Sequence, residues 1–390
     1  MPLLKSTLTA LLLAPAFSGS VALSAQSFVA HEWGTFTSVA GKDGVSVAWA
    51  PLSGPADLPC FVDRLSPLNI KLAEGLVRME TPVLYFYSKL NVTLSVQVDF
   101  PQGWLTEWYP QATKVKPDFS RNPREWMRFG NGRLEWDAVQ AQAAENPAFP
   151  AGIGPSRYYA ARNTDSAPLH IGGQQEKFIF YRGMANFLAP LEAVFRSDGK
   201  LVVRNTGSDT IPLAILFENH NGKIGYRVAH GLDHAVTLDP PELTGDVPAL
   251  RQDMVNSLVE FGLYKKEALA MLETWQDSWF EEGTRVFYIV PRPFVDAQLP
   301  LKITPAPATL ARVFVGRVET LSPWTQQTIE TALAKGDVPA LTRFGRFLNP
   351  FLVQIETANG HIAEAPAAQT YPQEASMRIW QEFNAASCVK

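Results

Sequence analysis

Short apolar runs separated by turn-forming residues are the feature that most restricts how this chain can fold. Val92–Val98 alternates apolar and polar residues, and Val83–Tyr87 is a continuous run of the length of a buried strand. Val45–Trp49 also alternates, and the preceding Gly41–Gly44 is typical of a hairpin turn. These patterns predict β structure from residue 28 to residue 115, followed by long ordered loops and short strands over 116–164.

A second group of predicted strands lies between Leu169 and Leu238. Turn residues separate them at Ser197–Gly199 and Asn205–Gly207. Short strands at this spacing, with turn signals between them, are typical of a β-sandwich. The predicted strands are Phe178–Tyr181, Glu192–Phe195, Leu201–Arg204 and Ile211–Glu218.

Helical periodicity interrupts the β pattern after residue 245. Asp246 is the expected N-cap of a helix that runs to about Phe261, and Gly262 separates it from a second helix, Lys265 to about Glu281. One apolar stripe on the second helix is formed by Ala268, Leu272, Trp275 and Trp279. β-type sequence returns at 285–290 and 312–318, and Ser322-Pro323 then begins another helix.

The hexapeptide Gly-Asp-Val-Pro-Ala-Leu occurs twice, at Gly245–Leu250 and Gly336–Leu341. In each copy Asp precedes Val-Pro, which is the arrangement of a helix N-cap and a first-turn proline. The similarity ends at the sixth residue, whereas solenoid repeats have shorter periods and extend throughout a chain. We therefore interpret the two copies as independent helix starts.

Together these patterns predict a mainly β (α+β) fold with two β-sandwich-like regions. The first region covers 26–165 and has long aromatic-rich loops, and the second covers 166–320 with a helical insertion at 246–282. A helical C-terminal segment follows at 321–390. The length of the chain fits two or three such core-forming units.

The N-terminus has the composition of a secretory signal peptide, which we assign to residues 1–25. Lys5 is the only charged residue before Glu32, and small residues follow an apolar run from Leu8 to Phe17. Because this run is short for a bilayer span, cleavage is favoured over retention as an anchor. We therefore predict a periplasmic or secreted protein with no integral membrane segment after cleavage.

Net charge limits the classes of partner that the chain could bind, and cysteine content limits the disulfides that it could form. The formal net charge is −4 and 18% of the residues are charged, so the sequence has no electrostatic footprint for nucleic acid. Cys60 and Cys388 are the only cysteines. In an oxidising compartment they could form a disulfide, and two buried thiols are the alternative. The oligomeric state stays open.

Histidines and one carboxylate form a candidate metal site. Three of the six histidines, His220, His230 and His234, lie within fifteen residues and close to Glu218. Imidazole and carboxylate groups suit Zn²⁺ or a similar divalent metal, and His31 is a candidate ligand from the N-terminal region. The same stretch also has ordinary hairpin sequence, so a solvated loop is the alternative.

His31 and Glu32 begin the hexapeptide His-Glu-Trp-Gly-Thr-Phe. On a strand their side chains face opposite sides, so only one of them can join a given site. Glu32 is a candidate catalytic carboxylate. Cleavage after Ala30 would make His31 an N-terminal copper ligand, but Phe28 is a poor residue three positions before such a cut. The simpler hypothesis is a structural strand with a hydrogen-bonded His31.

Carboxylates cluster where the second predicted helix ends. Asp277 and Glu281 are four residues apart, and general acid–base chemistry needs two carboxyl groups held several ångströms apart. Negative side chains at a helix C-terminus oppose its dipole, which often indicates a site or an ion pair. Both residues are therefore catalytic candidates. Arg285 and Arg292 follow closely, so a structural Glu–Arg network is the alternative.

Aromatic residues crowd the loop-rich part of the first region. Trp104, Trp108 and Trp126 lie near Glu107 and Arg157, and exposed aromatic surfaces with such polar neighbours suit sugar binding. These tryptophans are candidate ligand-binding residues for a glycan or envelope polymer. The alternative is a core that orders the loops.

Three segments, His31–Phe36, Glu80–Tyr87 and Asp277–Gly283, resemble a family of exported bacterial proteins whose mature chains begin with the same hexapeptide. The resemblance covers most of the mature chain and implies export, but no particular activity, catalytic residue or cofactor. The sequence has no serine-hydrolase elbow, His-Glu-x-x-His motif or phosphate-binding glycine loop.

Two functional hypotheses follow. One is a metal-assisted or carboxylate-based hydrolase of a cell-envelope or environmental polymer. The other is a non-catalytic ligand-binding or envelope-associated protein that uses exposed aromatic residues.

Overall fold

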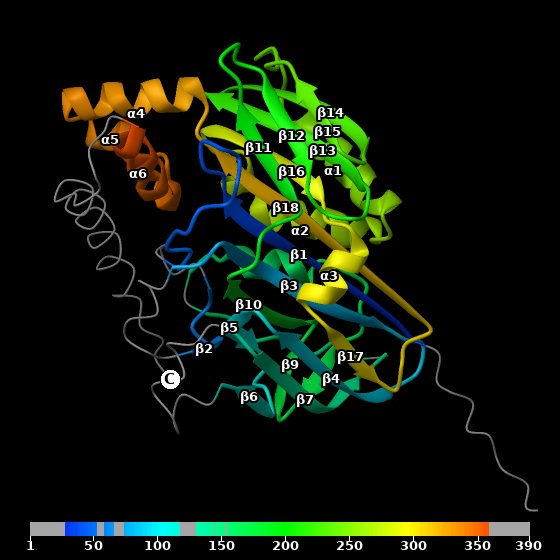
Figure 1. Cartoon of the computed structure of the whole chain (residues 1–390). Helices are drawn as coiled ribbons and strands as arrows, with labels where there is room; N and C mark the ends of the chain where they lie inside the picture. Colours follow the sequence, from blue (N-terminus) through cyan, green and yellow to red (C-terminus); the bar gives the residue numbers. More distant parts are fainter. Residues whose placement is uncertain are drawn as a thin grey trace, which may run out of the picture.

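A computed structural model describes residues 28–52, 58–65, 74–117, 130–143, 145–152 and 154–358 (Figure 1). The described chain is mainly β with several helices, as the sequence predicts. The proposed signal peptide, Trp126 and Cys388 lie outside the described residues. None of the helices in the described part is both long and apolar enough to span a membrane.

A nine-stranded sheet is the centre of the molecule. Its first strand in the chain, β1, pairs in parallel with β18, and the other neighbours pair antiparallel. In spatial order the strands are β14 (Lys223–Leu232), β13 (Ile211–His220), β16 (Gly283–Ile289), β18 (Thr309–Thr320), β1 (Val29–Val39), β3 (Val77–Tyr87), β10 (Ile179–Ala185), β5 (Gly103–Tyr109) and β2 (Asp63–Arg64).

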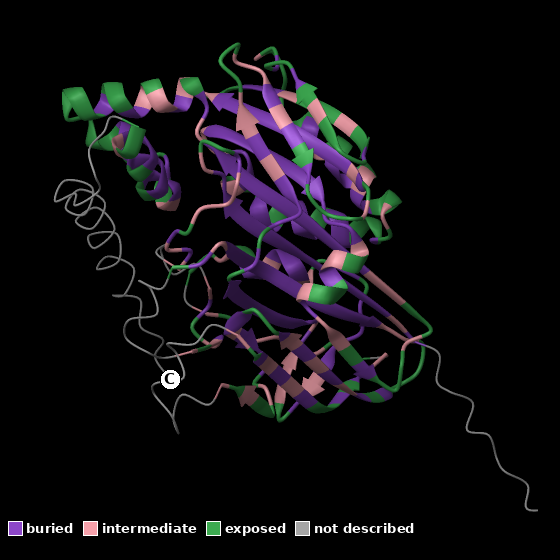
Figure 2. Ribbon diagram, viewed as in Figure 1, coloured by how far each residue is buried: buried purple, intermediate pink, exposed green. Residues whose placement is uncertain are grey.

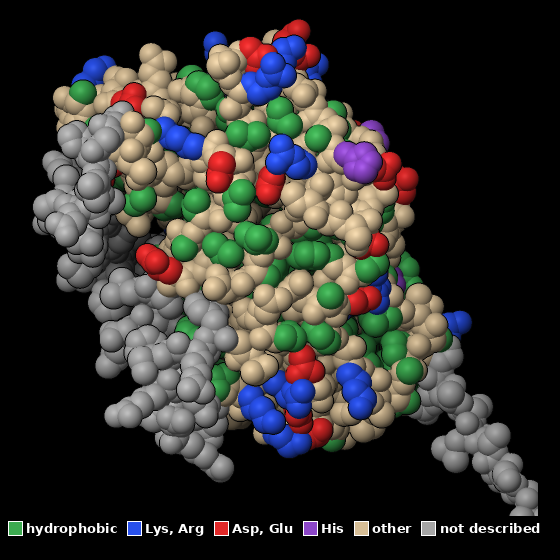
Figure 3. Space-filling model, viewed as in Figure 1, with side chains coloured by type: hydrophobic (Ala, Val, Ile, Leu, Met, Phe, Trp, Pro, Cys, Tyr) green, Lys and Arg blue, Asp and Glu red, His purple; other side chains and the backbone are tan. Residues whose placement is uncertain are grey.

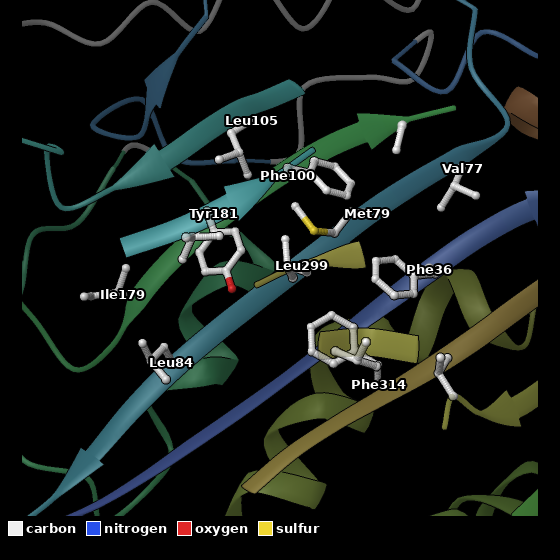
Figure 4. Close-up of a cluster of buried hydrophobic side chains, with 14 of the residues drawn as sticks. Phe36, Val77, Met79, Leu84, Phe100, Leu105, Ile179, Tyr181, Leu299 and Phe314 are labelled. Atoms are coloured by element: carbon white, nitrogen blue, oxygen red, sulfur yellow. The ribbon is translucent and has the colours of Figure 1, made fainter. Parts of the chain in front are cut away.

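Two smaller sheets pack on one face of the large sheet. The six-stranded sheet contains β17 (Leu301–Thr304), β4 (Val92–Phe100), β7 (Gly132–Ala141), β8 (Leu169–Ile171), β9 (Gln174–Glu176) and β6 (Lys114–Lys116). The three-stranded sheet contains β11 (Leu191–Phe195), β12 (Leu201–Asn205) and β15 (Ala235–Leu238). One apolar core joins all three sheets, and Figure 4 shows its central part with Phe36 of β1, Met79 of β3, Phe100 of β4 and Phe314 of β18.

This arrangement explains the two predicted sandwich-like regions. The second region contributes the three-stranded sheet, but the six-stranded sheet combines β4, β6 and β7 of the first region with β8, β9 and β17 of the second, and both small sheets lie against one continuous large sheet whose strands also come from both regions. The central strands β1 and β3 of the large sheet are buried along most of their length, whereas β4 alternates buried residues with partly or fully exposed ones (Figure 2). The difference follows from position, since β1 and β3 are covered on both faces.

Helices cover the opposite face of the large sheet. Helix α1 (Val247–Glu260) and helix α2 (Lys265–Trp279) lie there with the 3-10 helix η3 (Arg157–Arg162). The predicted α2 stripe is confirmed, because all four residues are buried in this second core: Ala268, Leu272, Trp275 and Trp279.

The C-terminal helices form a third, smaller core. Helix α3 (Arg292–Gln298) precedes β17, and α4 (Pro323–Lys335), α5 (Val338–Thr342), η4 (Gly345–Phe347) and α6 (Leu348–Ala358) follow β18. The helices after β18 pack on Val39 at the end of β1 and on Trp49. Figure 1 shows α4, α5 and α6 gathered at one side of the large sheet.

The duplicated hexapeptide marks two helix starts, as predicted. Asp246 accepts a hydrogen bond from the Ala249 N–H (2.7 Å) at the start of α1, and Asp337 accepts one from the Ala340 N–H (3.1 Å) at the start of α5. The shared sequence is therefore explained by local capping.

Candidate functional site

A pocket of about 1040 Å³ opens on the helix-covered side of the large sheet. Its described lining comes from β3, β5 and β10, from the chain before β3, from η3, from the C-terminal end of α2 and from η4. These elements are far apart in the sequence, so the pocket depends on the pairing of the large sheet.

Charged side chains from neighbouring strands form the floor of the pocket. Directly paired residues share a face of a sheet, so Arg182 of β10 lies beside Glu107 of β5. In the same way Arg78 lies beside Thr37, and Glu80, two residues after Arg78, shares that face. Further along the strands the same face becomes apolar and contacts α2.

Arg78 and Glu107 form the first ion pair of the floor. Arg78 Nη2 lies 3.2 Å from Glu107 Oε2, and its Nη1 donates to the Thr106 hydroxyl (3.1 Å). Arg78 is buried, whereas Glu107 keeps 18% of its side chain exposed. The pair therefore presents its carboxylate toward the pocket with the arginine held behind it.

Glu80 and Arg346 form the second pair. Glu80 Oε1 lies 2.6 Å from Arg346 Nη1, and its Oε2 accepts from the Thr37 hydroxyl (2.7 Å). Burial alone would raise the pKa of Glu80, but Arg346 and Arg78 outweigh it and hold the pKa at about 2. Glu80 is thus a fixed anion, and Arg346 is also held over the ring of Phe347.

The end of α2 is tied to the sheet by arginines. Arg285 of β16 donates to the backbone carbonyls of Trp279 (2.8 Å), Glu281 (2.6 Å) and Glu282 (2.9 Å). The Trp279 carbonyl is one that the helix end leaves without a partner, and the other two follow directly after α2. The positive charge of Arg285 also favours this end of the helix dipole, which offsets the acidic residues there.

Glu281 and Glu319 flank the buried Arg317. Arg317 Nη2 lies 2.8 Å from Glu281 Oε1, and its Nε lies 2.5 Å from Glu319 Oε1. Burial would lower the pKa of Arg317, but the two carboxylates raise it, so the group stays charged. Glu281 is therefore part of the Glu–Arg network that the sequence left as the alternative to a catalytic role.

Asp277, the other catalytic candidate at this helix end, lines the pocket at its outer rim. It forms an ion pair with Arg157 of η3 at 2.6 Å, and both side chains are exposed. Among the predicted catalytic residues, Asp277 and Glu281 thus reach the pocket.

Glu32 does not reach it. Its side chain is fully buried on the other face of the sheet, where Arg312 Nε donates to Oε2 (2.5 Å) and the Tyr181 hydroxyl donates to Oε1. A carboxylate sealed in the core has no access to a substrate, so the predicted catalytic role of Glu32 is corrected to a structural one.

His31 is buried on the helix side of β1, opposite Glu32, as the strand hypothesis requires. Its Nδ1 lies 2.8 Å from Glu267 Oε2 of α2, and the Tyr87 hydroxyl donates to Glu267 Oε1 (2.8 Å). The pair joins β1 to the first turn of α2. Within the hexapeptide, Gly34 leaves room for Phe314, because a Cβ there would lie 2.6 Å from Phe314 Cε1.

The structure does not bring the proposed metal ligands together. His220 Nε2 lies 3.2 Å from Glu218 Oε2, and the imidazole stacks on Trp324 with ring centroids 3.9 Å apart. His230 lies seven residues along β14 from Lys223, the partner of His220, which is about 23 Å at ~3.3 Å per residue. His234 is exposed beyond the end of β14. Across the described ranges, no three His, Cys, Asp or Glu side chains are placed to hold a metal ion.

The predicted ligand-binding tryptophans are core residues where they are described. Trp104 and Trp108 on β5 are 2% and 7% exposed, and neither is among the residues that line the pocket. The aromatic lining of the pocket comes instead from Tyr159, Trp275 and Phe347. Arg157 and Glu107, which the sequence associated with those tryptophans, do line the pocket.

Sequence reasoning missed the residues that build the pocket floor. Arg78 and Glu80 stand at alternate positions in a strand whose other residues are apolar or small, which is a local signal for a polar patch on one face. Arg182 and Arg346 carry no such signal, because only strand pairing and the fold of the C-terminal helices place them at the pocket.

No family model matches the chain, and no curated protein matches it in sequence. Among solved structures, the chain is similar to the Mu homology domain of Fcho1 from Danio rerio with a bound Eps15 peptide (TM-score 0.31) and to the yeast delta-COP-I mu-homology domain (TM-score 0.26). Each is 8% identical to this chain, and each alignment covers 76% of this chain and 96% of the other chain. At these TM-scores the likeness supports no inference about function.

Proposed function

We propose that the mature chain acts outside the cytoplasm as a glycan-binding protein and that the glycan occupies the pocket. The observation that carries the proposal is the pocket itself, about 1040 Å³ lined by arginine–carboxylate pairs and aromatic side chains. That volume is at the upper end of the range for small-molecule sites and fits a ligand of several sugar rings.

The polar lining offers the groups that bind sugar hydroxyls. A guanidinium donates through a planar fork and a carboxylate accepts at two oxygens, so a pair of them can bind adjacent hydroxyl groups. Glu107 is held by Arg78, and Arg346 is held by Glu80. Because these side chains are already positioned, they would lose little conformational entropy when a ligand binds.

The aromatic lining offers apolar contact for the C–H faces of sugar rings. Tyr159 is partly exposed and its hydroxyl accepts a hydrogen bond from the Gly152 N–H (2.7 Å), which fixes the ring. Trp275 and Phe347 are nearly buried and border the pocket from α2 and η4. Rings held in this way give contact area at low entropic cost.

The same geometry gives less support to the hydrolase hypothesis. Glu32 lies on the far face of the sheet, and Asp277 and Glu281 are each paired with an arginine. A general acid or base must reach the proton that it donates or removes, and these two carboxylates are instead held by guanidinium groups. Binding needs no such proton transfer.

The proposal is tested by screening the chain without residues 1–25 against a panel of neutral and acidic oligosaccharides. Tryptophan fluorescence and isothermal titration calorimetry report binding, since Trp275 borders the pocket. Arg346→Gln should weaken the binding of any ligand found by at least about tenfold, because it removes charge-assisted hydrogen bonds. The absence of binding to every sugar, or full affinity in Arg346→Gln, would contradict the proposal.

Arg204→Gln is the matched control. Arg204 also pairs with a glutamate, Glu192 at 2.9 Å, but on the exposed side of β12 and away from the pocket lining. Its substitution removes the same charge and should leave the affinity unchanged. Equal losses in both variants would indicate a general charge effect.

A further inference from the structure

Two hydrogen-bond donors beside the pocket have no acceptor among the described residues. Trp275 borders the pocket and is 5% exposed, yet its Nε1–H has no partner. Arg317 is fully buried, and its Nη1 likewise has none. A buried donor without an acceptor costs roughly 1–3 kcal/mol, so such groups call for an explanation.

Arg317 lies directly behind two side chains of the pocket wall. Glu281 Oε1 is 2.8 Å from its Nη2, and its guanidinium carbon is 4.9 Å from the centroid of the Phe347 ring. Glu281 and Phe347 both line the pocket. Glu281 is 29% exposed, so one of the two carboxylates paired with Arg317 also faces solvent on this side.

Both unpaired groups at this wall are donors, as are Trp33 Nε1 and Trp279 Nε1, which do not line the pocket. Within the described chain, buried acceptors without partners occur on side chains such as Asp63 and Glu356, and none of these residues lines the pocket. The wall formed by Trp275, Glu281 and Phe347 therefore borders unused donors and no unused acceptors. A ligand group that fits here must accept hydrogen bonds, and a guanidinium binds anionic acceptors most strongly.

We propose that the ligand is an acidic glycan whose carboxylate lies at the wall formed by Trp275, Glu281 and Phe347. This inference rests on the proposed glycan-binding function and specifies the class of sugar. The carboxylate accepts from Trp275 Nε1 and interacts with the charge of Arg317, while neighbouring hydroxyls bind the floor pairs. Because Glu281 is an anion at the same wall, it opposes the ligand charge and limits the affinity.

Matched sugar pairs test the charge requirement. Glucuronate with glucose and galacturonate with galactose differ at the C6 carboxylate, and glucose 6-phosphate distinguishes a phosphate from a carboxylate. Calorimetry should show the uronates binding at least about tenfold more tightly than their neutral partners, as expected for a hydrogen bond to a charged group. Neutral sugars that bind equally well would overturn this inference but leave glycan binding in place, whereas no binding by any sugar would overturn both. A preference for the phosphate would overturn the assignment of a carboxylate.

Trp275→Phe tests the donor, with Trp279→Phe as the matched control. The two indole rings stack on α2 with their centroids 6.4 Å apart, and each has an unpaired Nε1–H. Of the two residues, only Trp275 lines the pocket. Trp275→Phe should reduce uronate affinity about tenfold without changing that for the neutral sugar, and Trp279→Phe should change it less than about twofold. Equal effects of the two substitutions, or no effect of Trp275→Phe, would contradict the inference.

Glu281→Gln gives a second measurement of opposite sign. The amide can still accept a hydrogen bond from Arg317 but no longer repels an anion. Uronate affinity should therefore rise severalfold, an effect that general damage to the pocket could not produce. A fall in uronate affinity in this variant would place the carboxylate elsewhere.

Discussion

Arginine–glutamate pairs occur on both faces of the nine-stranded sheet, and two of them, one on each face, differ in their access to the pocket. On the face covered by the small sheets, Glu32 and Arg312 are 0% and 1% exposed, and Arg312 also pairs with Asp296 at 2.7 Å. On the helix-covered face, Glu80 and Arg346 border a pocket. The same pair of residue types is structural where it is sealed and available to a ligand where it meets solvent.

The contrast follows from what covers each face. Small sheets pack along one face, where the Glu32 carboxylate accepts hydrogen bonds from Arg312 and Tyr181. On the other face α2 ends before the strands do, and its last turn is anchored by Arg285. The remaining part of the strands carries charged residues, and η4 closes over it from the C-terminal helices.

The distribution of charged residues on the surface does not distinguish sealed arginine–glutamate pairs from those that border the pocket. Lysine, arginine, aspartate and glutamate side chains are interspersed in patches over the face shown in Figure 3. Burial and access to the pocket, rather than charge type, therefore distinguish a sealed pair from one that borders the pocket.

The largest expected effect is that of Arg312→Met. The substitution leaves the Glu32 carboxylate buried without its cation, which costs roughly 3–5 kcal/mol in the free energy of unfolding. Urea unfolding followed by fluorescence measures the loss. The double variant Glu32→Gln/Arg312→Met removes both charges and should recover part of it. If Arg312→Met lowers the free energy of unfolding by less than about 1 kcal/mol, water must reach the Glu32 carboxylate in solution, and the pair would not be buried as described.

Glu80→Gln should give an intermediate effect that depends on pH. The pKa of Glu80 is held at about 2 in the folded chain, below its ordinary value of 4.5. Its charge therefore stabilises the fold above pH 4.5, and that contribution is lost as the pH falls from about 4.5 to about 2. The loss in Glu80→Gln at neutral pH should be of order 3 kcal/mol, since one pKa unit is worth about 1.4 kcal/mol.

Unfolding free energies measured from pH 7 down to pH 2 test this expectation. The parent chain should lose stability more steeply than Glu80→Gln in the acid range, so that the two curves approach each other near pH 2. Glu218→Gln is a control, because Glu218 is also buried but pairs with His220 away from the pocket. Parallel curves for Glu80→Gln and the parent chain would refute the assigned charge state.

Much of the fold follows from local sequence. The alternation in Val92–Val98 and the stripe on α2 predict elements that the structure contains. Local sequence cannot specify the parallel pairing of β1 with β18, which joins residues about 280 positions apart. That pairing merges the two predicted regions into one sheet, and a pattern read over ten residues contains no information about it.

The site was harder to predict than the fold for the same reason. Asp277 and Glu281 were found because helix ends with unbalanced charge are visible in sequence. Arg346 and Arg182 meet Glu80 and Glu107 only through tertiary structure. The histidines are close in the sequence of a hairpin but not in space, because His220 and His230 lie at opposite ends of two paired strands.

Asp277→Asn should have the smallest effect and so defines the outer limit of the pocket. Its pair with Arg157 is exposed on both sides, 58% and 43%, and exposed pairs contribute less than about 1 kcal/mol to stability. Urea unfolding should therefore barely change. Removing this rim anion should also raise uronate affinity less than about fivefold, and the gain should disappear in high salt because an exposed charge is screened. A gain that persists in high salt would instead mean that the Asp277 carboxylate acts on the ligand from a buried position, as Glu281 does. Asp277 would then have to be counted among the residues of the wall and not of the rim.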